Sequence, residues 1–370
     1  MQTIGWIFRT LLSVALVLVG YDHAQGQFVY VNNETAPNTV SAFQLNSDGT
    51  LTPVPGSPFP TAGVGGGIQG FVDFSNATIH VNNDFLFVCN TLSHTVSVFM
   101  IRPDGSLTAI PRSPFATGGR FPIAVTTNPQ GTLLFVSNHD TGNLSVFTIG
   151  QGGVLSPVRG SPFDLQPLRQ PTSLAINSTG TMLLIGGENA LGIYTVSADG
   201  PVTAVTAPVE TGLNTQAVTL TENDRFVYVA GLNAPRGLAG FRLSSDGQLT
   251  SLAGSPFPAP SPSGFLGLAV NPRGNLLAAT VPGESNVYLY RVDAGGNLSL
   301  TAGSPYPGDG GELKPIRMDP TGTFVLAADV MNHTIHVWRI NAFARTLTEI
   351  TGSPFDLRHA RARPSGIAFK

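Results

Sequence analysis

Two arginines and one glutamate are the residues whose types and positions best suit chemistry on a small anion. Arg120 and Arg169 each lie two residues before a proline that has the same place in a repeated pattern. Two guanidinium groups presented alike could hold a carboxylate or phosphate through paired hydrogen bonds and stabilise an oxyanion. Glu188, if burial raises its pKa, could activate water as a general base. The simpler alternative is that all three are solvated loop residues.

The composition limits the classes of partner. Hydrophobic residues make up 42% of the 370 residues and charged residues only 11%, against about 25% in a typical soluble protein. The formal net charge of −3 argues against a nucleic-acid partner, because such proteins usually carry a basic face. A single cysteine, Cys89, excludes an internal disulfide and a cysteine-clustered zinc site.

A Gly-Ser-Pro-aromatic stretch, such as GSPFP at 56–60 and again at 254–258, recurs through the chain. The aligned prolines are Pro58, Pro114, Pro162, Pro256, Pro305 and Pro354, with Pro208 of TAPV in the one missing place. Successive spacings are 56, 48, 46, 48, 49 and 49 residues. Seven units of about 50 residues are typical of a solenoid, a propeller or an array.

Each unit contains short runs of β-branched and aromatic residues bounded by glycine, asparagine or proline, which are strand signals. In the third unit these runs are PIAVTTNPQG (122–131), LLFVSN (133–138), NLSVFTI (143–149) and VLSPVRGSPF (154–163). No segment after residue 27 keeps an apolar period of 3.6 residues, so helix is not expected. The pattern predicts an all-β fold, a seven-bladed β-propeller with four antiparallel strands per blade.

The two ends of the chain favour a closed ring over an open β-solenoid. FVYVNN (28–33) corresponds to the second strand of a unit, and PSGIAF (364–369) corresponds to the first strand. We therefore expect the C-terminal strand to join the N-terminal blade, with residues 27–370 forming one domain. The Gly-Ser-Pro-aromatic stretch is expected to end the fourth, outermost strand, because proline has no N–H to donate, and its aromatic ring is expected to fill the wedge between blades.

In a propeller the loops that lead into the innermost strands share one face with the loops that join second to third strands. We call the first kind lead-in loops, the second kind hairpin loops, and this face the mouth. The lead-in loops place there Arg120, Arg169, Lys314, His359, Arg361 and Arg363, and the hairpin loops place there Glu34, His94, His139, Asp140, Glu188 and His333. From these sets we predict Glu188 as the catalytic residue, and the substrate-binding residues Arg120, Arg169, Arg363 and His139.

The remaining histidines do not predict a metal site. His94 and His333 have the same place in the repeat, where a polar turn residue needs no ligand to explain it. His336 aligns with Ser97 and Ser145 in mid-strand, and no aspartate or glutamate lies at matching spacing. We expect neither a metal nor another cofactor, and we expect a monomer.

The N-terminus resembles a secretory signal peptide over residues 1–26. Arg9 supplies a positive flank, LLSVALVLVG (11–20) is a ten-residue apolar core, and Ala24-Gln25-Gly26 offers small residues for cleavage before Gln27. The apolar run is shorter than the roughly 20 residues that span a bilayer. We expect a secreted or periplasmic protein with no membrane span after cleavage; an uncleaved N-terminal anchor is the alternative.

The repeat unit resembles the seven-bladed propeller lactonase family, which is similar to bacterial 6-phosphogluconolactonase and to fungal carboxymuconate-lactonizing enzymes. The resemblance lies in PIAVTTNPQG, LLFVSN, LSVF and GSPF and their counterparts, and it covers residues 28–370. It implies a lactone-opening site at the mouth, with a His-x-His segment, an Arg-His pair and an acid. Glu188 matches the acid, whereas residues 120–123 lack the histidines and Thr172-Ser173 replace the Arg-His pair.

Two functions from different classes remain open. The first is an exported, lactonase-like hydrolase that opens a small anionic lactone at the channel mouth. The second is a non-catalytic secreted or periplasmic propeller that binds a glycan, peptide or protein on that surface. The matched acid and the paired arginines favour the first, and the missing histidines and the low charge favour the second.

Overall fold

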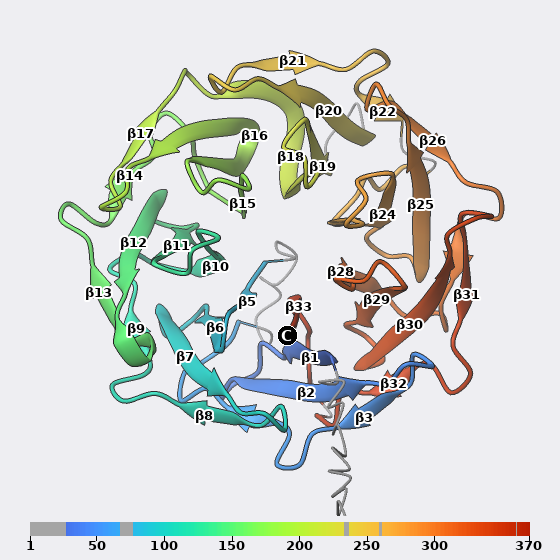
Figure 1. The fold of residues 1–370 in the computed structure, drawn as a ribbon, viewed down its shortest axis with the longest axis horizontal. Helices are drawn as coiled ribbons and strands as arrows, with labels where there is room; N and C mark the ends of the chain where they lie inside the picture. The colour runs from blue at the N-terminus through green and yellow to red at the C-terminus, as the bar shows by residue number, and fades with distance from the viewer. Residues whose placement is uncertain (1–26, 67–76, 233–236, 259–260, 360) are drawn as a thin grey trace, which may run out of the picture.

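The computed structural model describes residues 27–66, 77–232, 237–258, 261–359 and 361–370. Seven antiparallel blades stand around a central axis and follow one another along the chain (Figure 1). Five sheets are single blades, and one eight-stranded sheet joins two blades. The predicted seven-bladed propeller is confirmed. The predicted signal peptide, residues 1–26, lies outside the described residues.

Each blade is named here by its order along the chain, and its strands run from the axis outward. Blade 1 contains β33 (Gly366–Phe369), β1 (Gln27–Asn32), β2 (Thr39–Leu45) and β3 (Leu51–Pro53). Blade 2 contains β5 (Ile79–Asn82), β6 (Phe85–Asn90), β7 (Thr95–Ile101) and β8 (Leu107–Ala109). Blade 3 contains β10 (Pro122–Thr127), β11 (Leu133–Asn138), β12 (Asn143–Ile149) and β13 (Leu155–Pro157), with the short 3-10 helix η1 (Gln151–Gly153) before its last strand.

Blades 4 and 5 share long strands. Blade 4 contains β15 (Ser173–Ile176), β16 (Met182–Val196) and β17 (Val202–Ala204), and blade 5 contains the end of β18 (Val209–Leu220), β19 (Phe226–Gly231), β20 (Gly237–Leu243) and β21 (Leu249–Ser251). Blade 6 contains β23 (Gly267–Val270), β24 (Leu276–Thr280), β25 (Asn286–Val292) and β26 (Leu298–Leu300). Blade 7 contains β28 (Leu313–Met318), β29 (Phe324–Asp329), β30 (Thr334–Asn341) and β31 (Thr346–Glu349).

The ring closes as the chain ends predict. β33 pairs antiparallel with β1, with Val31 opposite Ile367, so the last strand is the innermost strand of blade 1 (Figure 1). The hydrophobic core is divided among the boundaries between blades. One cluster, for example, joins Tyr30 and Val40 of blade 1 to Ile79 and Leu86 of blade 2. Each blade is therefore stabilised mainly by burial against its neighbours.

The Gly-Ser-Pro-aromatic stretch has a different role from the predicted one. β3 ends at Pro53, before the stretch begins, and the aromatic residue starts a two-residue strand that pairs with the third strand of its blade. These short strands are β4 (Phe59–Pro60), β9 (Phe115–Ala116), β14 (Phe163–Asp164), β22 (Phe257–Pro258), β27 (Tyr306–Pro307) and β32 (Phe355–Asp356). The expectation that the stretch ends the fourth strand is wrong. Phe59 does pack against the cluster between blades, as expected.

The serine explains why the stretch is repeated. Ser57 Oγ accepts a hydrogen bond from the Ala42 amide at 2.9 Å, and Ser161 Oγ accepts one from the Val146 amide at 2.8 Å. The same contact recurs in blades 2, 5, 6 and 7. An amide of the third strand would otherwise be left unpaired where the outer strand stops.

In the described part of the chain, no helix is long and apolar enough to span a bilayer.

Candidate functional site

The mouth is built by hydrogen bonds between hairpin loops and lead-in loops. The Glu188 amide donates to the Arg169 carbonyl at 2.9 Å, and the Asp140 amide donates to the Arg120 carbonyl at 3.3 Å. The Arg363 amide donates to the Asn33 carbonyl at 2.8 Å. The two kinds of loop therefore share one face, as the sequence predicted.

The five predicted site residues lie on this face in three groups. Arg169 and Glu188 adjoin each other in blade 4, both with exposed side chains. Arg120 and His139 adjoin in blade 3, where His139 Nδ1 contacts Asp140 Oδ1 at 3.0 Å. Arg363 is exposed beside blade 1. The base role predicted for Glu188 called for a buried carboxyl, and this carboxyl is exposed.

Glu34 is a buried carboxylate of the mouth. It follows β1, has no exposed surface, and lies at the boundary between blades 1 and 2. Its Oε2 accepts hydrogen bonds from the Gly66 amide at 2.7 Å and the Thr91 hydroxyl at 2.8 Å. Its Oε1 accepts one from Asn32 Nδ2 at 3.1 Å. The sequence placed Glu34 at the mouth but did not predict that it would be enclosed.

The environment of Glu34 suits proton transfer near neutral pH. Burial raises the pKa of the Glu34 carboxyl to about 7, because water no longer solvates its charged form. The hydrogen bonds from Gly66, Thr91, Asn32 and Ser365 act in the opposite direction and limit the rise. Glu34 also has a φ of +51°, a left-handed conformation that is uncommon for a residue with a Cβ. Such backbone conformations are concentrated at functional sites.

Glycines cover Glu34 because no other residue fits there. A Cβ on Gly65 would lie 2.5 Å from the backbone carbon of Glu34, and a Cβ on Gly66 would lie 2.8 Å from Thr91 Oγ1. A Cβ on Gly63 would lie 2.2 Å from the side chain of Asn90. The glycines at 63, 65 and 66 therefore allow this segment to pass close to Asn90, the Glu34 backbone and Thr91.

Two neighbours of Glu34 have structural roles. Cys89 is fully buried, and burial together with the charge of Glu34 raises the pKa of its thiol well above its usual value. It is therefore not a nucleophile. His94 Nδ1 lies 3.1 Å from the Thr91 carbonyl and 3.2 Å from the Phe121 amide, and so joins blade 2 to the lead-in loop of blade 3. This contact supports the prediction that His94 needs no ligand.

The innermost strands hold an arginine and a histidine that the sequence analysis did not single out. Burial lowers the pKa of Arg317, on β28, to about 10. Burial and the charge of Arg317 lower the pKa of His80, on β5, to about 4. His80 is therefore neutral at pH 7, and its Nε2 contacts Thr127 Oγ1 at 3.1 Å. Their places within the runs IHVN (79–82) and LKPIRM (313–318), which form innermost strands, were the available signal in the sequence.

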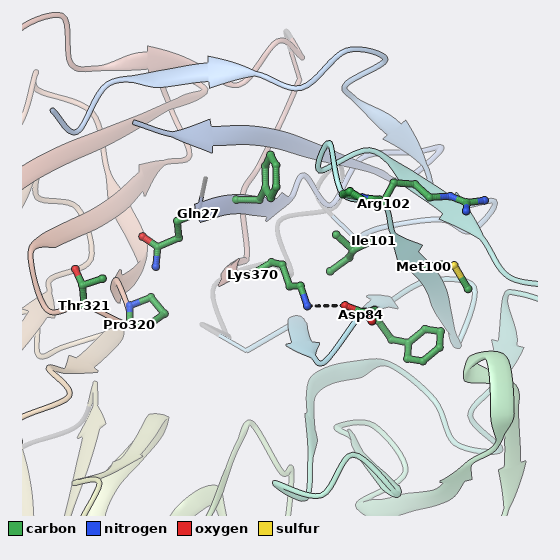
Figure 2. A pocket seen from close by; sticks show the side chains of 11 residues that line it. Gln27, Asp84, Met100, Ile101, Arg102, Pro320, Thr321 and Lys370 are labelled. Atoms are coloured by element: carbon green, nitrogen blue, oxygen red, sulfur yellow. Dashed lines mark hydrogen bonds and ion pairs between the residues drawn. The ribbon is translucent and has the colours of Figure 1, made fainter. Parts of the chain in front are cut away.

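A pocket of about 730 Å³ lies away from the mouth. It is lined by Asp84, Thr321 and Lys370, which follow or end innermost strands and so lie opposite the lead-in loops. Figure 2 shows Lys370 pointing toward Asp84 in this pocket, where Nζ and Oδ1 are 2.6 Å apart. None of the predicted site residues lines it.

A second cluster of ionisable groups lies between blades 6 and 7. His336 is fully buried, and its ligand atoms and those of Asp309 and Asp329 all lie within 4.8 Å of one another. Spacing along the sequence does not reveal this cluster, because Asp309 belongs to a loop 27 residues before His336. The fold brings the acids to His336, and within the described part of the chain these three residues form a group that could hold a metal ion.

Comparisons with known proteins agree with the fold. The sequence model of the family described as "Lactonase, 7-bladed beta-propeller" matches residues 21–165 and 178–359. A candidate 6-phosphogluconolactonase of Bacteroides fragilis is 20% identical, with a TM-score of 0.71 over 94% of this chain and 99% of that one. The periplasmic gluconolactonase PpgL of Pseudomonas aeruginosa is 18% identical, with a TM-score of 0.74 over 93% and 98%.

A protein from Lactobacillus plantarum is 14% identical, with a TM-score of 0.73 over 93% of this chain and 99% of that one. No curated protein matches the sequence. At these identities the solved structures show a common fold, while the family match covers most of the chain. The chain belongs to the seven-bladed β-propeller lactonase family.

Proposed function

We propose that this protein hydrolyses a small anionic lactone at the mouth, with Glu34 as the general base. One observation carries the proposal: Glu34 is a buried carboxyl whose pKa is raised to about 7, on the face where the sequence places the anion-binding arginines. A base with a pKa near the working pH transfers protons most effectively. Perturbed carboxyls of this kind are concentrated at active sites.

The proposed reaction needs one water molecule. Ionised Glu34 accepts a proton from the water, whose oxygen attacks the lactone carbonyl carbon. The ring C–O bond then breaks, and the proton passes from Glu34 to the departing alkoxide to give a hydroxy acid. Because Glu34 has no exposed surface and its carboxylate already accepts hydrogen bonds, the proposed step requires water to displace one of these donors. Arg120 and Arg169 are the proposed ligands of the anionic group of the substrate, with Arg363 and His139 as further contacts.

The substrate class is proposed as lactones of sugar acids. The names of the Bacteroides and Pseudomonas neighbours, a candidate 6-phosphogluconolactonase and a periplasmic gluconolactonase, support this choice. We also propose export, which the apolar core at 11–20 and the small residues before Gln27 support. An exported protein favours the unphosphorylated acid, because sugar phosphates are cytosolic. Recovery of a chain that begins near Gln27 outside the cytoplasm would support export, and retention of residues 1–26 would contradict cleavage.

A second candidate function is a non-catalytic propeller that binds a ligand at the mouth. The observation that favours it is the enclosure of Glu34, whose two oxygens already accept three hydrogen bonds at or below 3.1 Å. A carboxylate paired in this way could simply join the blades. The two functions differ in whether substitution of Glu34 removes a measurable turnover.

The experiment is a hydrolysis assay of the purified chain against γ- and δ-lactones of sugar acids, using wild type, Glu34→Gln and Glu188→Gln. We expect turnover in the wild type, loss of at least 100-fold in E34Q, and a change below tenfold in E188Q. Loss in E188Q with activity retained in E34Q would assign the base to Glu188. If all three proteins hydrolyse the lactones only at the background rate, the non-catalytic binding propeller is the function that remains.

A further inference from the structure

Blade 7 departs from a hydrogen-bonded pair that other blades repeat. In blade 2, Asn90 Nδ2 donates to Ser97 Oγ at 2.8 Å, and in blade 3, Asn138 Nδ2 donates to Ser145 Oγ at 2.7 Å. These pairs join the end of the second strand to the third strand. They are neutral, and they are sufficient to build a blade.

In blade 7 both members of the pair are replaced. In the strand register of blade 7, Asp329 lies opposite Thr334, just as Asn90 lies opposite Thr95 in blade 2. Likewise, Ala327 lies opposite His336 in blade 7, just as Val88 lies opposite Ser97 in blade 2. Aspartate and histidine therefore occupy the places of asparagine and serine. The neutral pair of blade 3 also leaves Asn138 Oδ1 buried without a partner among the described residues. That oxygen carries no charge, whereas the oxygens of an aspartate do, so the replacement in blade 7 calls for another explanation.

The carboxylate of Asp329 is incompletely paired. Asp329 has no exposed surface, and its Oδ1 accepts hydrogen bonds from the amides of Met331 and Asn332 at 2.7 and 2.8 Å. Its Oδ2 is buried and has no hydrogen-bond partner among the residues that the structure describes. A buried charged oxygen without a partner is costly. Ser285 Oγ, in the adjacent part of blade 6, is also buried without a partner.

The orientation of His336 is fixed from its other side. Its Nδ1 lies 2.7 Å from Glu349 Oε1, which also accepts a hydrogen bond from Ser353 Oγ at 2.8 Å. Trp338 stacks on the imidazole, with ring centroids 5.3 Å apart and planes 13° from parallel. A carboxylate at Nδ1 favours the tautomer with hydrogen on that nitrogen, and this leaves the Nε2 lone pair available. Nε2 lies 3.1 Å from Asp309 Oδ1.

We infer that His336 Nε2, Asp309 and Asp329 bind a divalent transition-metal ion of the Zn²⁺ type between blades 6 and 7. One imidazole and two carboxylates form a ligand set that such ions accept, and the Glu349–His336 pair is the usual support of a histidine ligand. Metal–ligand distances of about 2.1 Å place neighbouring ligand atoms about 3.0–3.4 Å apart, which agrees with the 3.1 Å between Nε2 and Asp309 Oδ1. The side chain of Asp309 is 33% exposed and gives the ion a path from solvent.

The metal would join two blades. Asp309 lies in the lead-in loop that follows β27 of blade 6, whereas Asp329 and His336 belong to β29 and β30 of blade 7. A cation in this position neutralises the unpaired Oδ2 of Asp329 and links blades 6 and 7. Because an ion that binds only the folded state stabilises it, the inference predicts a metal-dependent melting temperature.

The test uses the full chain without a histidine tag, stripped with a chelator and then dialysed. Titration with Zn²⁺ by calorimetry, with Mn²⁺ in a parallel arm, is expected to show one ion bound per chain. At ~100-fold excess over Kd, Zn²⁺ should raise Tm by roughly 4 °C. The double variant Asp329→Asn/His336→Ser restores the pair found in blades 2 and 3, so it should fold but neither bind the ion nor shift its Tm. His359→Ala, outside the cluster, should bind like the wild type.

Two results would overturn the inference. The first is a wild-type chain that takes up neither ion and melts at the same temperature with and without them. The cluster would then be a set of hydrogen-bonded side chains that holds His336 between Asp309 and Glu349. The second is equal uptake by the wild type and the D329N/H336S variant, which would place the ion elsewhere. Neither result depends on lactone hydrolysis.

Discussion

The hydroxyl of Thr91 in blade 2 donates a hydrogen bond of 2.8 Å to the carboxylate of Glu34 in blade 1. Both residues are buried, and the contact crosses a boundary between blades. It is therefore part of what holds the ring together and part of what sets the protonation of the proposed base. The two roles can be separated by measurement.

Thr91→Val is expected to lower the free energy of unfolding, because it removes a hydrogen bond to the Glu34 carboxylate. Valine has nearly the same shape but cannot donate to Oε2, so a buried acceptor loses one partner, at a cost of about 1–3 kcal/mol. Chemical denaturation at pH 8 would measure this loss in the free energy of unfolding. In an E34Q background the loss should shrink, because the charged acceptor is absent. Equal losses in both backgrounds would show that the contact with Glu34 contributes nothing.

The raised pKa of Glu34 predicts the pH dependence of stability. The carboxyl titrates near 4.5 when the chain is unfolded and near 7 when it is folded, so between these values the folded state binds more protons. The free energy of unfolding should therefore fall as pH rises from about 4.5 to about 7, by an amount on the order of 3 kcal/mol. Denaturation at several pH values would show this slope in the wild type and a flatter one in E34Q. If wild type and E34Q have the same slope of unfolding free energy against pH, the pKa of Glu34 is not raised.

The repeated serine predicts a cost for its removal. In Ser161→Ala the Val146 amide loses the acceptor that lies 2.8 Å from it, and the free energy of unfolding should fall by about 1–2 kcal/mol. Ser156→Ala, at an exposed position of β13, is the control and should change it by less than about 0.5 kcal/mol. If both variants have the same free energy of unfolding, Ser161 is a turn residue whose hydrogen bond does not stabilise the sheet.

Ring closure predicts the effect of a short deletion. Removal of residues 366–370 deletes β33, leaves β1 with an unpaired edge and removes Ile367 from the core cluster of blades 7 and 1. We expect loss of a cooperative melting transition by circular dichroism and association by gel filtration, because unpaired strand edges promote aggregation. Lys370→Ala is the control; it removes a partly exposed ion pair and should cost less than about 1 kcal/mol. A monomeric, cooperative deletion variant would show that closure is dispensable.

The sequence predicted the blades because each strand is a local pattern with a local boundary. LLFVSN and NLSVFTI became β11 and β12 with the predicted limits. The chain begins with a second strand and ends with a first strand, and this predicted the pairing of β1 with β33. The role of the Ser-Pro-aromatic stretch was missed, because the amide that donates a hydrogen bond to its serine belongs to a strand fifteen residues away.

The candidate site was harder to predict because burial is not a local property. Glu34 and Glu188 are both hairpin-loop acids, but the glycine segment at 63–66 covers only the first. That run of glycines was the available signal, since residues without a Cβ permit close approach of a backbone. Asp309 meets His336 across a boundary between blades, and only the fold brings them together.

The pH–rate profile of lactone hydrolysis tests the central claim most directly. With Glu34 as the base, kcat/KM should rise with pH to a plateau above an apparent pKa of about 7, because only the ionised carboxyl accepts the proton of water. The E188Q variant should keep that inflection, and E34Q should lose the activity that shows it. Hydrolysis by E34Q with the inflection near 7 intact, or no hydrolysis by the wild type at any pH, would contradict the account.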